Sequence, residues 1–315
     1  MKNVIITGAT GVIGMALIQK CIEEGTKVTV LANPGSRRLS RIPDNALVNV
    51  IFCGLNEYSS ADAGSLGLDN IALNDGFDAF FHLSWGGTFG EARNNMELQR
   101  SNEEYTMDAL RLASRLGCRC FVGAGSQAEY GRVEGVLSAD TPCNPENGYG
   151  ICKLSAGIRS RELAAELGIR HCWTRVLSIY GPYDGDNTMI TSTVNKLLHG
   201  DKPSLTKGEQ MWDYLYASDA ANALYLVGKS GRNGGIYPIG SGKARLLREY
   251  IEIMRDAVDP TLPLGIGEIL YSDKQVMYLC ADISELKRDT GFEPKIDFED
   301  GIKLTIDFLR KGNPQ

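Results

Sequence analysis

Short β-rich segments alternate with longer helical segments over the first 181 of the 315 residues. Strands separated by helices are typical of a parallel sheet with helices on both faces. The pattern predicts strands at residues 3–8, 27–32, 48–54, 77–85, 118–125 and 169–181. It predicts long helices at residues 11–25, 95–117 and 149–168. We therefore expect an α/β fold with a doubly wound parallel sheet.

The alternation stops after Pro182, where loop-rich segments separate shorter helices from isolated strands such as 212–217 and 236–240. A last helix is predicted around residues 298–312. We expect a smaller C-terminal lobe for the substrate, interleaved with the last elements of the sheet. The predicted division is residues 1–177 with 210–240 for the dinucleotide domain, and 178–209 with 241–315 for the substrate lobe.

Composition excludes several classes of protein. The formal net charge of −6 argues against nucleic-acid binding, which calls for a clustered positive excess. No segment approaches the about 20 apolar residues that span a bilayer, and no signal peptide precedes the first strand. The eight cysteines contain no CxxC pair and no cluster at metal-ligand spacing. We expect a soluble cytoplasmic protein with free thiols and no metal site.

A glycine-rich loop, "TGATGVIG", connects the first predicted strand to the first predicted helix. Gly8, Gly11 and Gly14 allow a tight turn, close approach to a pyrophosphate, and packing of the helix on the sheet. The helix N-terminus adds amide donors. This context predicts a dinucleotide site of the Rossmann type. Its contacts are expected from Gly8, Thr10, Gly11, Val12, Ile13 and Gly14.

The end of the second strand bears on the choice of cofactor. NAD-specific folds carry an acidic residue there for the ribose hydroxyls, whereas an arginine suits a 2′-phosphate. Here Ala32 and Asn33 are followed by Arg37 and Arg38. We therefore favour NADP over NAD, with Asn33, Arg37 and Arg38 as contacts.

Tyr149 and Lys153 lie four residues apart at the start of a predicted helix, so their side chains share one face. A phenol is a poor base near neutral pH, but a neighbouring ammonium group lowers its pKa. The pair therefore predicts acid–base chemistry at this helix.

Several motifs in order resemble the extended short-chain dehydrogenase/reductases, in the NAD-dependent epimerase/dehydratase family of nucleotide-sugar enzymes. They are "TGATGVIG", "FFHLSW", "NEEYT", "GSQAEYG", "YGICK", "RVLSIYGP", "WDYLYASDAA" and the closing "ADISELKRDTGFEP". The resemblance implies an enzyme that transfers hydride between a nucleotide-linked sugar and a nicotinamide dinucleotide. It also implies a nucleotide-sugar partner and a homodimer formed through the two long helices that flank the fifth strand.

The resemblance also implies residue roles. Tyr149 would exchange a proton with the substrate, Lys153 would hold the nicotinamide ribose, and Ser126 would hydrogen-bond the reacting oxygen. Further cofactor contacts are implied for Leu83, Ser84 and Asn102. Substrate contacts are implied for Ser126, Gln127, Ser178 and Trp212.

Two departures from the family pattern narrow the choice of reaction. The family's 4,6-dehydratases carry Asp-Glu where this chain has Gln127 and Ala128, so dehydration is disfavoured. Glu129 is expected to point away from Ala128 by strand alternation. The remaining reactions are reduction of a 4-keto(-6-deoxy)hexose nucleotide, which the NADP prediction favours, and epimerisation with tightly bound cofactor. A dinucleotide-sensing protein without catalysis is a third hypothesis, which the Tyr149–Lys153 pair disfavours.

The substrate side departs from the family at Trp212, where an arginine commonly meets the diphosphate, and at Ser178, where an asparagine is usual. Phosphate recognition would then fall to other cations, among them Lys196, Lys202 and Lys207, or to backbone amides. Trp212 either stacks on the substrate or belongs to the core.

Overall fold

Within the described residues, 1–74 and 76–312, seven parallel strands form the central sheet of this computed structural model. Their order is β11-β6-β5-β4-β1-β2-β3. The strands are β1 (Asn3–Thr7), β2 (Lys27–Ala32), β3 (Val48–Phe52), β4 (Ala79–His82), β5 (Cys120–Ser126), β6 (Arg170–Val176) and β11 (Gly235–Ile239). The strand order reverses between β1 and β4, and folds of this kind bind ligands at the carboxyl ends beside such a reversal.

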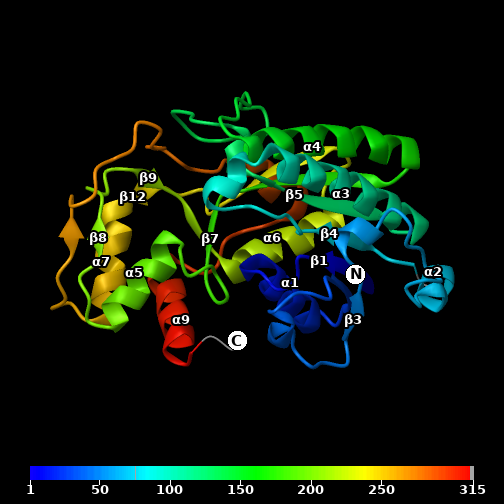
Figure 1. Ribbon diagram of the computed structural model, residues 1–315, viewed down its shortest axis with the longest axis horizontal. Coiled ribbons are helices and arrows are strands. Elements are labelled where there is room, and N and C mark those ends of the chain that lie inside the picture. Colours follow the sequence, from blue (N-terminus) through cyan, green and yellow to red (C-terminus); the bar gives the residue numbers. More distant parts are fainter. Residues whose placement is uncertain (75, 313–315) are drawn as a thin grey trace.

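Helices cover both faces of the sheet (Figure 1). On one face α1 (Val12–Glu23) packs against α6 (Ala217–Ser230), and on the other α3 (Met96–Arg115) packs against α4 (Gly148–Leu167). The short α2 (Asp69–Asn74) precedes β4. No helix among the described residues is long and apolar enough to cross a membrane. The predicted doubly wound α/β fold is confirmed.

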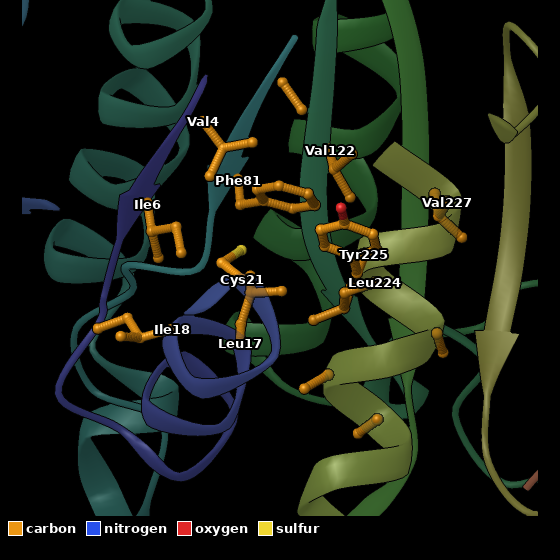
Figure 2. Packing of buried hydrophobic residues seen from close by; sticks show 14 of the residues in the cluster. Val4, Ile6, Leu17, Ile18, Cys21, Phe81, Val122, Leu224, Tyr225 and Val227 are labelled. Atoms are coloured by element: carbon orange, nitrogen blue, oxygen red, sulfur yellow. The ribbon is translucent and has the colours of Figure 1, made fainter. Parts of the chain in front are cut away.

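Apolar layers fix the sheet between its helices. Figure 2 shows side chains of α1 and α6 packed on one face of the sheet, and the labelled residues include Leu17, Ile18, Leu224, Val4, Ile6 and Phe81. A second cluster on the other face includes Phe80, Phe121, Leu110 and Leu112. Full burial of one such side chain contributes about 1.5–3 kcal/mol. This packing holds the carboxyl ends of the strands, where the candidate site lies.

The remaining elements gather beyond one end of the sheet (Figure 1). There α5 (Met189–Leu198), α7 (Leu247–Val258) and α9 (Phe298–Arg310) pack on one another around a third apolar cluster. The other elements are β7 (Ser178–Tyr180), β8 (Ser204–Leu205), β9 (Met211–Trp212), β10 (Tyr214–Tyr216), β12 (Arg245–Leu246), β13 (Gly265–Ile266) and α8 (Ser284–Thr290). The domain boundaries stay a prediction, and positions 75 and 313–315 of those ranges lie outside the described residues.

Two strand predictions are corrected. The expected strand 169–181 divides into β6, in the main sheet, and β7, which pairs with β10 in a separate two-stranded sheet. The segment 236–240, expected to be an isolated strand, corresponds to β11, which pairs with β6 as the seventh strand of the main sheet. An apolar run does not reveal the residue at which its pairing partner changes, so the sequence pattern could not locate this division.

Candidate active site

The loop between β1 and α1 is closed tightly against the end of β4. Gly8 has a φ of 68°, and a Cβ there would lie 2.7 Å from the carbonyl carbon of Leu83. A Cβ on Gly14 would lie 2.4 Å from the Gly8 oxygen. Gly11 is the N-cap of α1, no side chain caps this helix, and its first turn has no acidic residue. The N-terminal amides of α1 are therefore suited to an anionic group such as a pyrophosphate.

Residues 33–41, directly after β2, include three arginines and no acidic residue. Ala32 is buried, and Asn33 accepts a hydrogen bond from the amide of Gly35 at 2.9 Å. Arg37 and Arg38 are both exposed. This arrangement suits a phosphate on the adenosine ribose better than a bare ribose.

Arg41 joins the glycine loop to the second lobe. Its Nη1 donates to the oxygen of Thr10 at 3.3 Å, and its guanidinium lies 5.3 Å from the centre of the Tyr183 ring. Its buried Nε has no hydrogen-bond partner among the described residues. Sequence reasoning missed this residue, although it is the third arginine within five positions.

The tip of β5 and the start of α4 position the catalytic candidates. The Ser126 hydroxyl accepts a hydrogen bond from the amide of Ala128 at 3.2 Å, which ends β5 in the short 3₁₀ helix η4 (Gln127–Glu129). Asn147 caps α4 by accepting from the amide of Gly150 at 2.9 Å. One turn of this capped helix then places Tyr149 and Lys153 on the same face.

Tyr149 lines the same cavity as Ser126. Burial raises the pKa of Tyr149, while the hydrogen bond with Ser126 and the charge of Arg93 act in the opposite direction. The Arg93 guanidinium lies 4.9 Å from the centre of the Tyr149 ring. Arg93 comes from η3 (Gly90–Asn94), a segment that sequence reasoning did not associate with the site.

Lys153 is buried beside the tyrosine. Its ammonium group donates to the oxygen of Ala124 at 2.5 Å and lies 3.8 Å from the centre of the Trp85 ring. Burial lowers the pKa of Lys153 to about 7, and the charge of Glu129 only partly opposes this effect. The ammonium is 5.8 Å from the centre of the Tyr149 ring, close enough to stabilise a phenolate.

Trp85 is fixed by α3. Its indole N–H donates to Gln99 Oε1 at 2.7 Å. One turn further along α3, Asn102 accepts from the amide of Gly86 at 2.8 Å and donates to the oxygens of Gly86 and Leu98 at 2.9 and 3.0 Å. Asn102 therefore holds the loop after β4. A direct cofactor contact from Asn102 stays a prediction.

A cavity of about 460 Å³ collects the three catalytic candidates and several of the other predicted residues. Those that line it are Val12, Ile13, Leu83, Ser126, Tyr149, Lys153, Ser178 and Trp212. The Trp212 indole donates to the Ser178 hydroxyl at 2.8 Å. The cavity thus runs from the start of α1, past the catalytic candidates, to the second lobe. Arg37 and Arg38 do not line it, and Gln127 lines a neighbouring cavity instead.

Glu129 lies against β6. Its carboxylate accepts from Arg175 Nε at 2.8 Å, from the Trp173 indole at 3.0 Å, and from the amide of Ser126 at 2.8 Å. The prediction that Glu129 points away from Ala128 rested on strand alternation, but residues 127–129 form a 3₁₀ turn, so that reasoning was wrong. The Glu129 carboxylate, which directly follows Gln127 and Ala128, is therefore held in a buried ion pair with Arg175.

Two other polar side chains have structural partners. His82 bonds to the hydroxyl of Thr7 at 3.0 Å, and burial lowers its pKa to about 3, so it is neutral in the core. Asp219, in the first turn of α6, accepts from the amides of Lys295 and Ile296, both at 2.8 Å.

Comparison with known proteins decides the family. Residues 4–240 match the model of the NAD dependent epimerase/dehydratase family. The chain belongs to this family. One relative is the dTDP-6-deoxy-L-talose 4-dehydrogenase (NAD(+)) of Aggregatibacter actinomycetemcomitans, 27% identical over 79% of this chain and 88% of the relative.

Solved structures share the fold at lower identity. The UDP-N-acetylglucosamine 4-epimerase of Methanobrevibacter ruminantium M1, in complex with UDP-N-acetylmuramic acid, has a TM-score of 0.86 with 23% identity and covers 98% of both chains. The UDP-glucose 4-epimerase of Thermotoga maritima, with UDP-glucose, has a TM-score of 0.85 with 21% identity and covers 98% of this chain and 99% of its own. The predicted family and fold are confirmed.

The residues of this family member fit a nicotinamide dinucleotide. The uncapped start of α1 suits the pyrophosphate, and the cavity beside Tyr149 and Lys153 has room for a nicotinamide ribose. Sequence reasoning missed Trp85, Arg93 and Arg41, because all three lie on irregular segments whose course no periodicity predicts. A large aromatic directly after "HLS" was the available signal for Trp85.

Proposed function

We propose that this protein is an NAD(P)-dependent oxidoreductase that acts at C4 of a nucleotide-linked hexose. The observation that carries the proposal is that Ser126, Tyr149 and buried Lys153 line one cavity, which begins at the start of α1 after the glycine loop. These are the groups that acid–base catalysis at a secondary alcohol or ketone needs.

The three side chains have distinct roles in this proposal. In the oxidative direction Tyr149 takes the proton of the C4 hydroxyl, and in the reductive direction it returns a proton to the ketone oxygen. Ser126 holds the same oxygen, and Lys153 stabilises the phenolate form of Tyr149 and holds the nicotinamide ribose. When bound, the dinucleotide supplies or accepts the hydride at its nicotinamide ring.

The preferred cofactor in this proposal is NADP. The support is the pair of exposed arginines, Arg37 and Arg38, together with the missing acid at Ala32 and Asn33. Four similar structures are described as complexes with NAD, so NAD is the alternative.

The first candidate for the overall reaction is net reduction of a 4-keto(-6-deoxy)hexose nucleotide. Its support is the NADP preference and the relative named as a dTDP-6-deoxy-L-talose 4-dehydrogenase. The second candidate is a 4-epimerase that keeps its cofactor, and the two structural neighbours named as 4-epimerases favour it. Dehydration is not proposed, because Gln127 and Ala128 supply no acid or base and Glu129 is held by Arg175.

The nucleotide would occupy a separate cavity of about 430 Å³, which is lined by residues from the range 187–275 and by none of the central sheet. Trp212 lines both this cavity and the catalytic one, and Lys196 lies on its wall. Lys196 could therefore pair with a phosphate, while Lys202 is paired with Glu268 on the surface. In this proposal the sugar would lie between Trp212 and Tyr149, which both line the catalytic cavity.

The predicted homodimer stays a proposal. Ile151 and Ile158 of α4 are each 46% exposed, and α4 belongs to the helix pair through which the family resemblance implies a dimer. Light scattering on the purified protein, with Ile151→Lys as a variant, would measure the assembly. The cytoplasmic location also stays a prediction.

The test starts from the cofactor that purifies with the protein. Tightly bound NAD(P) that survives gel filtration supports epimerisation, and rapid oxidation of added NADPH by a 4-keto-6-deoxyhexose nucleotide supports reduction. A non-catalytic dinucleotide sensor would turn over neither that ketosugar nor UDP-glucose and dTDP-glucose. In that case Tyr149→Phe would change cofactor affinity alone, and the proposal would be wrong.

A further inference from the structure

A second cavity, of about 370 Å³, adjoins the catalytic one on the far side of the Ser126–Gln127 peptide. Its polar lining includes Arg93, Gln127, Arg132, Glu146 and Lys274. Ser126 lines the catalytic cavity and Gln127 lines the second. Arg93 also lines the second cavity while it packs on the ring of Tyr149. A sugar held at Tyr149 therefore has the second cavity as its neighbour.

Two polar atoms of this cavity have no partner. Nε of Arg93 and Oε1 of Gln127 are buried and make no hydrogen bond among the described residues. Buried polar groups are otherwise almost always paired, so such atoms call for an explanation. A bound polar group is one that satisfies both, since the Gln127 amide can rotate to present either its oxygen or its NH₂.

The charge of the cavity selects the kind of group. Arg132 is paired with Glu146, whose two oxygens lie 2.8 and 3.0 Å from Arg132 Nε. Arg93 and Lys274 have no ion pair within the described part of the chain. The cavity therefore carries an excess of two positive charges, and a guanidinium with a free donor binds carboxylates in particular.

The position of Gln127 indicates which carbon of the hexose would carry the carboxylate. In the proposed reaction Ser126 holds the oxygen on C4, so the next residue lies near the carbons attached to C4. In a hexopyranose these are C3, which bears a hydroxyl, and C5, which bears C6. Only C6 can be a carboxylate without breaking the sugar chain.

We infer that the substrate of this site is a nucleotide-linked hexuronate, whose C6 carboxylate is bound by Arg93 and Gln127. The inference rests on the proposed function and names the class of its sugar. It also favours the epimerase candidate, because a 4-keto hexuronate is a β-keto acid that loses CO₂ unless the ketone is reduced promptly in the same site. Reduction of a 6-deoxy sugar would leave both unpaired atoms without a partner.

Calorimetry on the cofactor-saturated full chain tests the inference with two matched pairs of sugars, UDP-glucose with UDP-glucuronate and dTDP-glucose with dTDP-glucuronate. The measured quantity is the ratio of Kd for the neutral sugar to Kd for the acidic sugar within one pair. Because both members share the nucleotide, a general change at the site cancels in this ratio. We expect the wild-type ratio to be about 10 or more, since hydrogen bonds to charged groups contribute that much.

Variants test whether Arg93 and Gln127 cause the preference for the acidic sugar. Arg93→Gln and Gln127→Glu should each lower the ratio about 10-fold or more, the first by removing a charge and the second by repelling the carboxylate. Arg100→Gln removes a charge from an exposed position on α3 outside both cavities and should leave the ratio unchanged. If Arg93→Gln does not fold, the result for Gln127→Glu decides.

Two outcomes overturn the inference, and they are distinguishable. If glucose nucleotides bind at least as tightly as glucuronate nucleotides, or if the ratio survives in both variants, the hexuronate inference is wrong while the proposed function stands. If none of the four sugars binds to the cofactor-saturated protein, the proposed function fails and the inference fails with it.

Discussion

The ammonium group of Lys153 lies 3.8 Å from the centre of the Trp85 ring and has no carboxylate in contact. Its one hydrogen bond in the described structure is to the oxygen of Ala124. A buried lysine without a paired acid loses its proton more readily than one in water, which is why the pKa of Lys153 falls to about 7. The amine of Lys153, beside Tyr149, therefore gains or loses its proton near neutral pH.

This pKa predicts a pH dependence of stability. Between pH 7 and the ordinary lysine value near 10.4, the unfolded chain binds the Lys153 proton and the folded protein does not, so stability rises with pH. Lys153→Met lacks this effect. In urea unfolding without cofactor, wild type should gain about 2 kcal/mol relative to Lys153→Met between pH 7 and pH 9. A difference between the two proteins that stays constant over this range would contradict the burial of a titrating amine.

The ion pair of Glu129 and Arg175 should be essential for stability. The two side chains are 0% and 6% exposed, so removal of one leaves a buried charge without its partner. Glu129→Ala should lower the free energy of unfolding by about 3–5 kcal/mol. Glu293→Ala breaks the exposed pair with Lys287 and is the matched control, expected to cost less than about 1 kcal/mol. Equal losses in the two variants would show that the pair near β5 is not buried.

The glycine loop allows a sharp comparison of two alanine substitutions. A Cβ on Gly14 would meet backbone at 2.4 Å, whereas one on Gly11 would have its nearest neighbour at 3.7 Å. Gly14→Ala should therefore destabilise the cofactor-free protein by about 1–3 kcal/mol, and Gly11→Ala by less than about 1 kcal/mol. Gly11→Ala should still weaken dinucleotide binding in calorimetry, because the pyrophosphate approaches the start of α1 closely. Normal stability of Gly14→Ala would show that the loop is looser than described.

The pair Arg37 and Arg38 should set the preference between cofactors. The double variant Arg37→Ser with Arg38→Ser removes two cations that would face a 2′-phosphate. The ratio of Kd for NADH to Kd for NADPH should fall about 10-fold or more, as expected for loss of charge-assisted hydrogen bonds. Fluorescence titration of the reduced cofactors measures both constants. A ratio that does not change would assign the preference to other residues, Arg41 first among them.

The sequence predicted the parts of the site that depend on local pattern. Gly8, Gly11 and Gly14 lie between a strand and a helix that periodicity alone locates, and Tyr149 and Lys153 share a face because helical geometry fixes their spacing. For these residues the sequence therefore predicted both the residue and the strand, loop or helix that carries it.

What the sequence could not predict depends on side chains that meet from distant segments. Arg93 reaches Tyr149 from a loop without periodicity, and Arg175 reaches Glu129 across the β5–β6 pairing. The alternation argument for Glu129 did not apply, because a strand was assumed where the chain makes a 3₁₀ turn. The change of partner after β6 was missed because β7 is as apolar as the strand before it.

The central claim is hydride transfer at C4 with Tyr149 as the acid–base group. The most direct measurement mixes excess enzyme and oxidised NAD or NADP with UDP-glucose or UDP-glucuronate deuterated at C4, quenches the mixture within the first turnover, and analyses the reduced cofactor by mass spectrometry. We predict that deuterium appears on the nicotinamide with wild type and that its rate of appearance falls about 10²–10⁴-fold in Tyr149→Phe. Absence of deuterium from the cofactor with wild type, or equal rates in the two proteins, would contradict the account.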